Sequence, residues 1–340
     1  FKAPYAKKRR LHYEGEELGA TYNKSRSNMW SYADWDGDGD KDIVVGIDTW
    51  DDYGWDNAFD SLGRWTRGPL HGYVYLLENT GRGYVNRGKV EAAGAPIDVY
   101  GAPNPCIADF DGDGDPDLIC GEFVDGLTWF ENVGTRTEPR FAAGRPLANK
   151  HGEIRLHLEM IVPVVSDFDG DGHPDLIVGD EDGRVAWVRH TGKVKKGMPQ
   201  FESPVYFTQQ ADLVKFGALS TPCAFDWDGD GKLDLLIGSV KRSSYPSPER
   251  GLPYSRFKKK EIGLQVMLLI NAGTNEKMVF KEPVQLQIDG KDFYLGAHSN
   301  APEPCMLGDT SKGPNLVVGC ESGKYFFFEH DRITTVGIDD

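Results

Sequence analysis

A nine-residue acidic motif occurs four times in this chain and constrains its fold more than any other feature. The copies are DWDGDGDKD at 34–42, DFDGDGDPD at 109–117, DFDGDGHPD at 167–175 and DWDGDGKLD at 226–234. Each copy follows a short apolar stretch, and its last Asp opens an apolar segment that ends in Gly. Self-similarity of this kind indicates a series of equivalent structural units.

The spacing of the copies predicts the size of one unit. The intact copies start 75, 58 and 59 residues apart, and a fifth, degenerate copy spans Glu303 to His330. Each interval holds four short antiparallel strands, since strands average about five or six residues. Four-stranded antiparallel units in series are typical of β-propeller blades. The sequence therefore predicts an all-β, five-bladed β-propeller of four-stranded blades.

The blades are expected to form one domain over 1–340. The last one has three strands, and the segment 1–20 resembles the outer strands of other blades, so we expect it to join the last blade and close the propeller. A seven-bladed propeller is the alternative, with about 49 residues per blade. The end of the chain at Asp340 leaves room for further domains. The expected blades are at about 28–99, 100–150, 155–210, 215–290 and 295–335.

The carboxylates of the motif predict a metal site in each intact copy. Asp at positions 1, 3, 5 and 9 of a glycine-rich turn supplies hard oxygen ligands, which calcium prefers, whereas magnesium keeps more water. A merely solvated acidic turn is disfavoured because like charges this close repel one another. In the fifth copy Lys312 is the hypothetical internal cation. The ligands are Asp34, Asp36, Asp38 and Asp42, Asp109, Asp111, Asp113 and Asp117, Asp167, Asp169, Asp171 and Asp175, and Asp226, Asp228, Asp230 and Asp234.

These D-x-D-G-D-G-x-x-D-L-x-x-G repeats resemble the FG-GAP or VCBS repeats of calcium-binding β-propellers. The resemblance extends over nearly the whole chain and implies the propeller fold and about four structural calcium ions. It also implies a likeness to carbohydrate-active five-bladed propellers, several of which are glycoside hydrolases. Fold alone does not decide activity.

Glutamates near the expected propeller axis are the candidate catalytic residues. In the aligned inner strands, Glu303 is the one carboxylate in a row with Met29, Asn104, Val162 and Thr221. An axial carboxylate has little structural purpose, and glycoside hydrolysis requires a pair of them. Two second-strand ends and the loop entering blade 3 add carboxylates at the same end. The catalytic candidates are Glu303, Glu122, Glu159 and Glu321.

Aromatic and basic residues at the same end are the candidate substrate contacts. The insertion 48–72 interleaves aromatic rings with Asp and Arg, which is typical of a sugar-binding wall. The alternative is a satellite core beneath a long loop. The second insertion, 240–262, is basic and favours an acidic substrate, with a solvated loop as the alternative. The candidates are Trp50, Trp55, Trp65, Arg67, His71, Asn104, Arg155, His157, His298 and Arg242.

Together with these features, the resemblance to carbohydrate-active five-bladed propellers implies a glycoside hydrolase that removes a terminal sugar from an acidic, pectic plant cell-wall polysaccharide. Several five-bladed hydrolases act on L-arabinofuranosides, so the resemblance implies an L-arabinofuranosidase as the specific hypothesis. One alternative is a polysaccharide lyase acting on a uronate-containing glycan, with Arg and His in the catalytic roles. The other is a non-catalytic carbohydrate-binding or adhesion propeller. The partner in each case is an oligo- or polysaccharide.

Charge and hydropathy exclude other partners. The net charge of −15 opposes binding to nucleic acid, and four calcium ions would bring it to about −7. No apolar run approaches the roughly 18 to 20 residues that membrane insertion requires. Calcium-binding turns suit a secreted, periplasmic or cell-surface protein, where the ion is abundant. The five cysteines lack zinc-ligand spacing and are expected to be small buried apolar residues.

Overall fold

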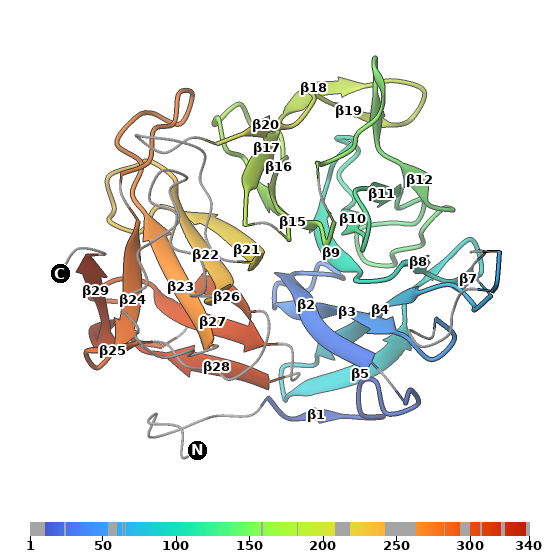
Figure 1. The fold of residues 1–340 in the computed structure, drawn as a ribbon, viewed down its shortest axis with the longest axis horizontal. Coiled ribbons are helices and arrows are strands. Elements are labelled where there is room, and N and C mark those ends of the chain that lie inside the picture. Colours follow the sequence, from blue (N-terminus) through green and yellow to red (C-terminus); the bar gives the residue numbers. More distant parts are fainter. Residues whose placement is uncertain are drawn as a thin grey trace. The chain divides into compact units, whose positions relative to one another are not determined.

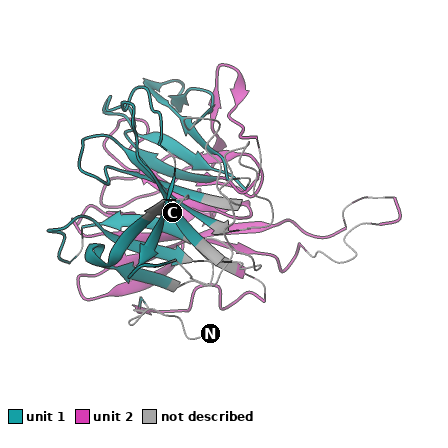
Figure 2. Ribbon diagram, turned by 60° about the vertical axis from the view of Figure 1, so that its left-hand side comes forward, with its two compact units in different colours: residues 1–11, 162–340 teal, residues 12–161 magenta. Residues whose placement is uncertain are grey.

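In the part of the chain that the structure describes, the computed structural model contains strands and one 3-10 helix, η2 (His330–Arg332), and the chain divides into two compact units (Figures 1 and 2). Unit 2 comprises 12–161, and unit 1 comprises 1–11 and 162–340. No helix among the described residues is long and apolar enough to cross a membrane. The described residues are 11–23, 25–53, 60–62, 64, 66–157, 159–181, 183–207, 218–241, 263–281, 283–292, 300–306, 308–320 and 324–337.

Unit 2 contains two antiparallel blades. In the first, β2, β3, β4 and β5 pair in chain order, and β8 pairs with β4. The first blade consists of β1 (Tyr13–Glu14), β2 (Ser25–Ala33), β3 (Asp42–Thr49), β4 (His71–Asn79), β5 (Tyr84–Lys89) and β8 (Asp98–Tyr100), followed on its outer side by the hairpin β6 (Glu91–Ala92) and β7 (Ala95–Pro96). The second consists of β9 (Asn104–Ala108), β10 (Asp117–Gly121), β11 (Leu127–Phe130) and β12 (Arg145–Pro146), and is followed by the hairpin β13 (Ala148–Asn149) and β14 (Gly152–Glu153).

Unit 1 contains three blades, of which the last has three strands. The third blade consists of β15 (Val162–Ser166), β16 (Asp175–Gly179), β17 (Val185–Val188) and β20 (Val205–Tyr206), with the hairpin β18 (His190–Val194) and β19 (Pro199–Phe201). The fourth consists of β21 (Ala218–Phe225), β22 (Asp234–Lys241), β23 (Gly263–Leu269), β24 (Val284–Ile288) and β25 (Lys291–Asp292), and β29 (Ile333–Gly337) pairs with β24. The fifth consists of β26 (Asn300–Cys305), β27 (Asn315–Cys320) and β28 (Lys324–Phe328).

The acidic motif fixes where each blade begins. In the first four blades the motif connects the first strand to the second, and its last Asp is the first residue of that second strand. β3, β10 and β16 are buried along their whole length, as expected for central strands covered on both faces. The prediction of an all-β, five-bladed β-propeller is confirmed, and the seven-bladed alternative fails because the described residues form five blades.

The apolar residues that follow the motif form the cores of the units. In unit 2 one cluster joins Val44 of β3 to Leu118 and Cys120 of β10. In unit 1 one cluster includes Leu236, Leu286 and Leu316, and another is built around Phe168 and Phe280. Among the described cysteine side chains, Cys106, Cys120, Cys223 and Cys305 are buried free thiols, which confirms their predicted apolar role.

The predicted pairing of the N-terminal segment with the last blade is wrong for its described part. Tyr13 and Glu14 form the short strand β1, which pairs in parallel with Tyr84 and Val85 of β5 in the first blade. Residues 1–10 lie outside the described residues, so the closure remains a prediction for them. Only sequence likeness supported that pairing, and the next strands along the chain provide a nearer free edge for β1.

Candidate metal-binding turns and aromatic surface

Each acidic motif folds into the same tight turn, called here turn 1 (34–42), turn 2 (109–117), turn 3 (167–175) and turn 4 (226–234). Glycine at positions 4 and 6 adopts positive φ, for example 80° at Gly112 and 99° at Gly114, which other residues rarely adopt. The carboxylates of the turn fold it by accepting backbone N–H groups. Asp109 accepts from the nitrogen of Gly112 at 2.7 Å, and Asp113 accepts from that of Asp115 at 2.9 Å.

In every turn three carboxylates lie close enough to bind one metal ion. One oxygen from each member lies within 4.8 Å of the others. Positions 1, 3 and 5 form the cluster in turns 2 to 4, whereas turn 1 uses positions 1, 3 and 9. Three convergent hard oxygens fit a calcium ion. Asp38, Asp117, Asp175 and Asp234 are outside these clusters, and their role as ligands stays a prediction.

The Asp at position 9 is a buried support for the turn. Asp42 accepts the backbone N–H of Trp35 at 2.8 Å and that of Asn79 at 2.7 Å, so it connects the turn to the end of β4. Burial raises the pKa of Asp42 to about 6, against the lowering effect of these two donors. Burial likewise raises the pKa of Asp117 to about 7, against the lowering effect of the hydrogen bond that it accepts from the Asn132 N–H. A buried carboxylate ionised at neutral pH is stabilised by a nearby cation, which is a further reason to expect metal ions at these turns.

Basic side chains oppose the charge of three turns to different extents. Arg136 lies 2.9 Å from Asp34 in turn 1, and Arg189 contacts both Asp169 and Asp171 in turn 3. In turn 4 the Lys232 ammonium lies 2.6 Å from Asp230. Within the described residues, no Lys or Arg forms an ion pair with the clustered carboxylates of turn 2. That turn therefore has the strongest electrostatic requirement for a bound cation.

The fifth, degenerate turn replaces the buried carboxylate with an amide. Asn315 opens β27 where the other blades have the position-9 Asp, and its Oδ1 accepts the backbone N–H of His330 at 2.7 Å. Its Nδ2 donates to the carbonyl of Asp309 at 3.2 Å, a bond that a carboxylate cannot make. Lys312 is exposed and lies 3.5 Å from Asp331, so the hypothesis of an internal lysine cation is wrong. The neutral amide of Asn315 instead removes the buried negative charge that a cation would have to balance.

Four rings in unit 2 gather at the ends of two blades, and we call them the Trp50 cluster: Trp50, Tyr53, Tyr100 and Phe123. Trp50 meets Tyr53 edge to face at 6.3 Å and Phe123 at 6.4 Å between ring centroids. Its indole Nε1 donates to Asp48 at 2.9 Å. The backbone N–H of Phe123 donates to the carbonyl of Tyr100, whose side chain is 40% exposed. The cluster is thus a partly exposed aromatic surface.

Carboxylates border the Trp50 cluster. Burial, a hydrogen bond with Tyr53 and the nearby charge of Glu159 raise the pKa of Tyr100, which places Glu159 beside the cluster. Asp52 immediately precedes Tyr53, and its carboxylate lies 3.6 Å from His71 Nε2. Aromatic faces bordered by carboxylates match the chemistry of saccharide recognition, in which rings contact C–H faces and carboxylates accept hydroxyl groups.

His71, a predicted substrate contact, is held by its surroundings. Its Nδ1 lies 2.6 Å from Asp98, so each ring nitrogen faces a carboxylate. The imidazole stacks on Tyr73 at 5.7 Å and 4°, and Tyr73 stacks in turn on Tyr22. The Lys89 ammonium lies 3.4 Å from the Tyr73 centroid. This packing fixes the orientation of His71.

Three further predicted residues of unit 2, Asn104, Glu122 and Arg155, contact other groups of the protein. Asn104 is buried, and its Nδ2 donates at 2.8 Å to the carbonyls of Ala102 and Ile161, whereas its Oδ1 has no partner among the described residues. Its role as a substrate contact stays a prediction. Arg155 is paired with Asp125 and Glu153. Glu122 accepts a hydrogen bond from the Thr128 hydroxyl. Arg67 and His157 are exposed.

Glu303 lies on β26 of unit 1, whereas Glu122 and Glu159 belong to unit 2. Its carboxylate accepts a hydrogen bond from the Cys223 thiol of β21 at 3.4 Å. Burial raises the pKa of Glu303 to about 7, although this hydrogen bond acts in the opposite direction. Glu303 therefore holds a proton over much of the range below neutral pH, as a general acid must.

The remaining predicted site residues lie outside the described residues: Trp55, Trp65, Glu321, His298 and Arg242. Sequence reasoning also left out several residues that the structure places at the sites. Phe123 and Tyr100 were not singled out, although Phe123 directly follows the second-strand segment DLICGE, a position that could have been compared with Trp50. Nothing in the local sequence indicates that Arg136 reaches turn 1 from another blade.

Comparisons with known proteins support the assignment of the acidic repeat and add little beyond it. Residues 167–237 match the model of the FG-GAP-like repeat family. No curated protein matches the chain. A lectin of Agrocybe aegerita, from work on recognition of non-reducing terminal N-acetylglucosamine, is 15% identical with a TM-score of 0.40, over 92% of this chain and 81% of the lectin chain. A Photorhabdus luminescens Tc holotoxin pore is 14% identical with a TM-score of 0.35, over 92% of this chain and 14% of the toxin chain. TM-scores this low support no statement about ligands. The similarity to the FG-GAP-like repeat family covers the third and fourth turns.

Proposed function

We propose that this protein is a calcium-stabilised β-propeller that binds a saccharide at the Trp50 cluster. The observation that carries the proposal is the partly exposed group of four aromatic rings bordered by Asp52 and Glu159. Rings supply flat apolar surfaces for sugar C–H faces, and the carboxylates accept hydrogen bonds from hydroxyl groups. Oligosaccharides of pectic side chains are the first substrates to test. A secreted, periplasmic or cell-surface location fits the calcium-binding turns.

Replacement of Trp50 by alanine should weaken saccharide binding about tenfold or more, since a lost ring contact costs at least about 1.4 kcal/mol. Isothermal titration calorimetry with arabino-oligosaccharides and galacturonate-containing oligosaccharides measures the effect. Tyr84→Ala, which removes a ring from β5 of the same unit away from the cluster, is the matched control and should bind as the wild type does. Equal weakening in both variants, or none in Trp50→Ala, would remove the Trp50 cluster from the proposal.

A second candidate function is glycoside hydrolysis, and Glu303 favours it. A carboxyl group with a pKa raised to about 7 by burial is protonated at mildly acidic pH and can donate a proton to a leaving glycosidic oxygen. The specific hypothesis is exo action that releases terminal L-arabinofuranose. The alternatives are a lyase that acts on uronates and a propeller that only binds. The two functions are compatible, because a hydrolase also needs a surface that holds its glycan.

The hydrolase hypothesis predicts that activity falls as pH rises through about 7, because the acid must be protonated in order to donate. Glu303→Gln should abolish the release of reducing sugar from pectic side-chain oligosaccharides. Cys223→Ser, which keeps a hydrogen-bond donor beside Glu303, is the control and should retain activity. A new ultraviolet-absorbing double bond would instead identify a lyase, and a fully active Glu303→Gln variant would exclude Glu303 as the acid.

A further inference from the structure

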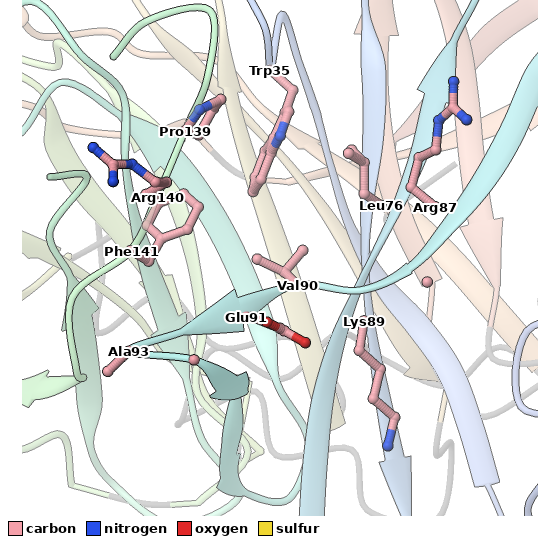
Figure 3. Close-up of a pocket in the computed structure, with 12 residues that line it drawn as sticks. Trp35, Leu76, Arg87, Lys89, Val90, Glu91, Ala93, Pro139, Arg140 and Phe141 are labelled. Carbon is pink, nitrogen blue, oxygen red and sulfur yellow. The ribbon is translucent and has the colours of Figure 1, made fainter. Parts of the chain in front are cut away.

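A cavity of about 520 Å³ lies in unit 2 between the outer strands of the first two blades (Figure 3). Its walls come from β5, from the β6–β7 hairpin and from residues 139–141 of the second blade. The volume lies within the range of small-molecule sites. The cavity is separate from the Trp50 cluster and does not include the carboxylates of the acidic turns.

Backbone geometry keeps this cavity open. The β4–β5 pairing shifts register after Leu76, and Gly88 at the shift has a φ of 87°. A Cβ atom on Gly88, or on Gly94 of the hairpin, would meet nothing within 4 Å, so both glycines face open space. The hairpin is anchored to the second blade by the N–H of Ala93, which donates to the carbonyl of Phe141 at 2.8 Å. The walls of the cavity are therefore preformed in the absence of a ligand.

The floor of the cavity is apolar. Trp35, Leu76, Val90 and Phe141 are core residues, and each retains only 6 to 9% exposure. Figure 3 shows Trp35, Val90 and Phe141 converging on the cavity from three separate segments. The indole and the phenyl ring lie 5.4 Å apart at an angle of 47°. Such a slot fits one face of a flat apolar group, and among these four floor residues only the Trp35 side chain, through its indole N–H, can hydrogen-bond a sugar hydroxyl.

The rim of the cavity is basic in a protein that is acidic overall. Arg87, Lys89 and Arg140 line it against one carboxylate, that of Glu91. Arg87 is held by Glu78 through two hydrogen bonds of 2.9 and 2.8 Å, and Lys89 lies over Tyr73. Within the described residues, Arg140 forms no ion pair. Arg140 adjoins Phe141 and is exposed. Figure 3 shows its guanidinium directed away from Trp35 and Val90, and rotation of this exposed side chain can bring it to an anion above the apolar slot.

We propose that this cavity binds a small amphipathic carboxylate, with its flat apolar body on Trp35, Val90 and Phe141 and its carboxylate on Arg140. Burial of the ring supplies the affinity, and the charge supplies the orientation. The ligand class differs from the saccharide of the Trp50 cluster. The two sites use different residues, so each can fail without the other.

Calorimetric titration of the whole chain with indole-3-acetate, in calcium-containing buffer, tests the proposal. A Kd on the order of 100 μM is expected for a ligand of this size. Neutral indole should bind several-fold more weakly because it lacks the carboxylate. Glucuronate, which has the charge without the apolar body, should show no saturable binding. Tighter binding of glucuronate than of indole-3-acetate would overturn the proposal in favour of a sugar-acid site.

Two variants locate the binding. Val90→Trp fills the slot and should abolish the titration signal, whereas Arg140→Glu reverses the rim charge and should weaken binding about tenfold. Arg82→Glu makes the same charge change at an exposed residue outside the cavity and should bind as the wild type does. Melting temperatures show whether the Val90→Trp protein folds. If it does not fold, the affinity of the Arg140→Glu variant alone tests the proposal. Wild-type affinity in Arg140→Glu, or no saturable binding of indole-3-acetate to the wild type, would refute the proposal.

Discussion

Chelation by EDTA should lower the melting temperature of this protein by more than about 10 °C, the largest change in stability that we expect from any change of solvent. An ion held at a hundred times its Kd contributes about 2.7 kcal/mol, so four filled turns contribute on the order of 10 kcal/mol. Without ions, three carboxylates in each turn face one another within 4.8 Å. Scanning calorimetry in calcium and in EDTA, followed by restoration of calcium, measures the effect.

Single-turn variants test whether the acidic turns cause that loss. Asp111→Asn in turn 2, where no ion pair to Lys or Arg involves the clustered carboxylates in the described residues, should reduce the EDTA effect by about a quarter, since one of four sites is lost. Asp331→Asn makes the same change at an exposed carboxylate paired with Lys312 and should leave the effect intact. An unchanged melting temperature in EDTA would contradict a structural role for calcium, and full protection by magnesium would contradict the choice of ion.

Gly46→Ala should destabilise unit 2 by at least about 4 kcal/mol, the range of severe core mutations. A Cβ atom at Gly46 would lie 1.7 Å from the carbonyl oxygen of Pro103. Both atoms belong to main chain, and Gly46 is fixed in β3 by its pairing with Met29 and Val74, so neither strand can move away cheaply. Chemical denaturation of the variant, followed by circular dichroism, measures the loss.

Gly94→Ala is the matched control for that change. Gly94 has a φ of 80° but open space around it, so alanine there should cost only the about 1 to 2 kcal/mol of a left-handed residue. The comparison separates backbone strain from collision between β3 and the segment that enters the second blade. A Gly46→Ala protein as stable as the control would show that the two segments are not packed as described.

The repeat predicted the fold because the motif combines two independent constraints. Its glycines permit one turn geometry, and its last Asp marks the residue at which the second strand begins, as Asp117 does for β10. The continuous apolar run that follows the motif is buried on both faces, so its hydrophobic pattern and its place after the turn both predict a central strand. The edges of the blades lack such a constraint. Likeness of short outer segments therefore led to the wrong partner for Tyr13 and Glu14.

Local sequence was a weaker guide to the sites than to the fold. The turn carboxylates could be predicted because their spacing is within one motif. The contact of Arg136 with Asp34, by contrast, depends on how one blade's hairpin reaches a neighbouring blade, and no local pattern records that. Asn104 was selected because it shares a row with Glu303, yet its amide is used by two backbone carbonyls. Position along a strand does not reveal which atoms of a polar side chain already have hydrogen-bond partners.

The return of the last strand to the fourth blade makes two neighbouring blades interdependent. β29 follows the fifth blade in sequence but pairs along its full length with β24, from Val284 to Ile288 (Figure 1). The fifth blade is therefore flanked in the chain by two segments that belong to one sheet. Loss of β29 would leave an unpaired edge on β24, a template for association with other chains. β29 thus protects the edge of a strand that lies some fifty residues earlier in the sequence, and the fourth and fifth blades cannot be separated as modular units.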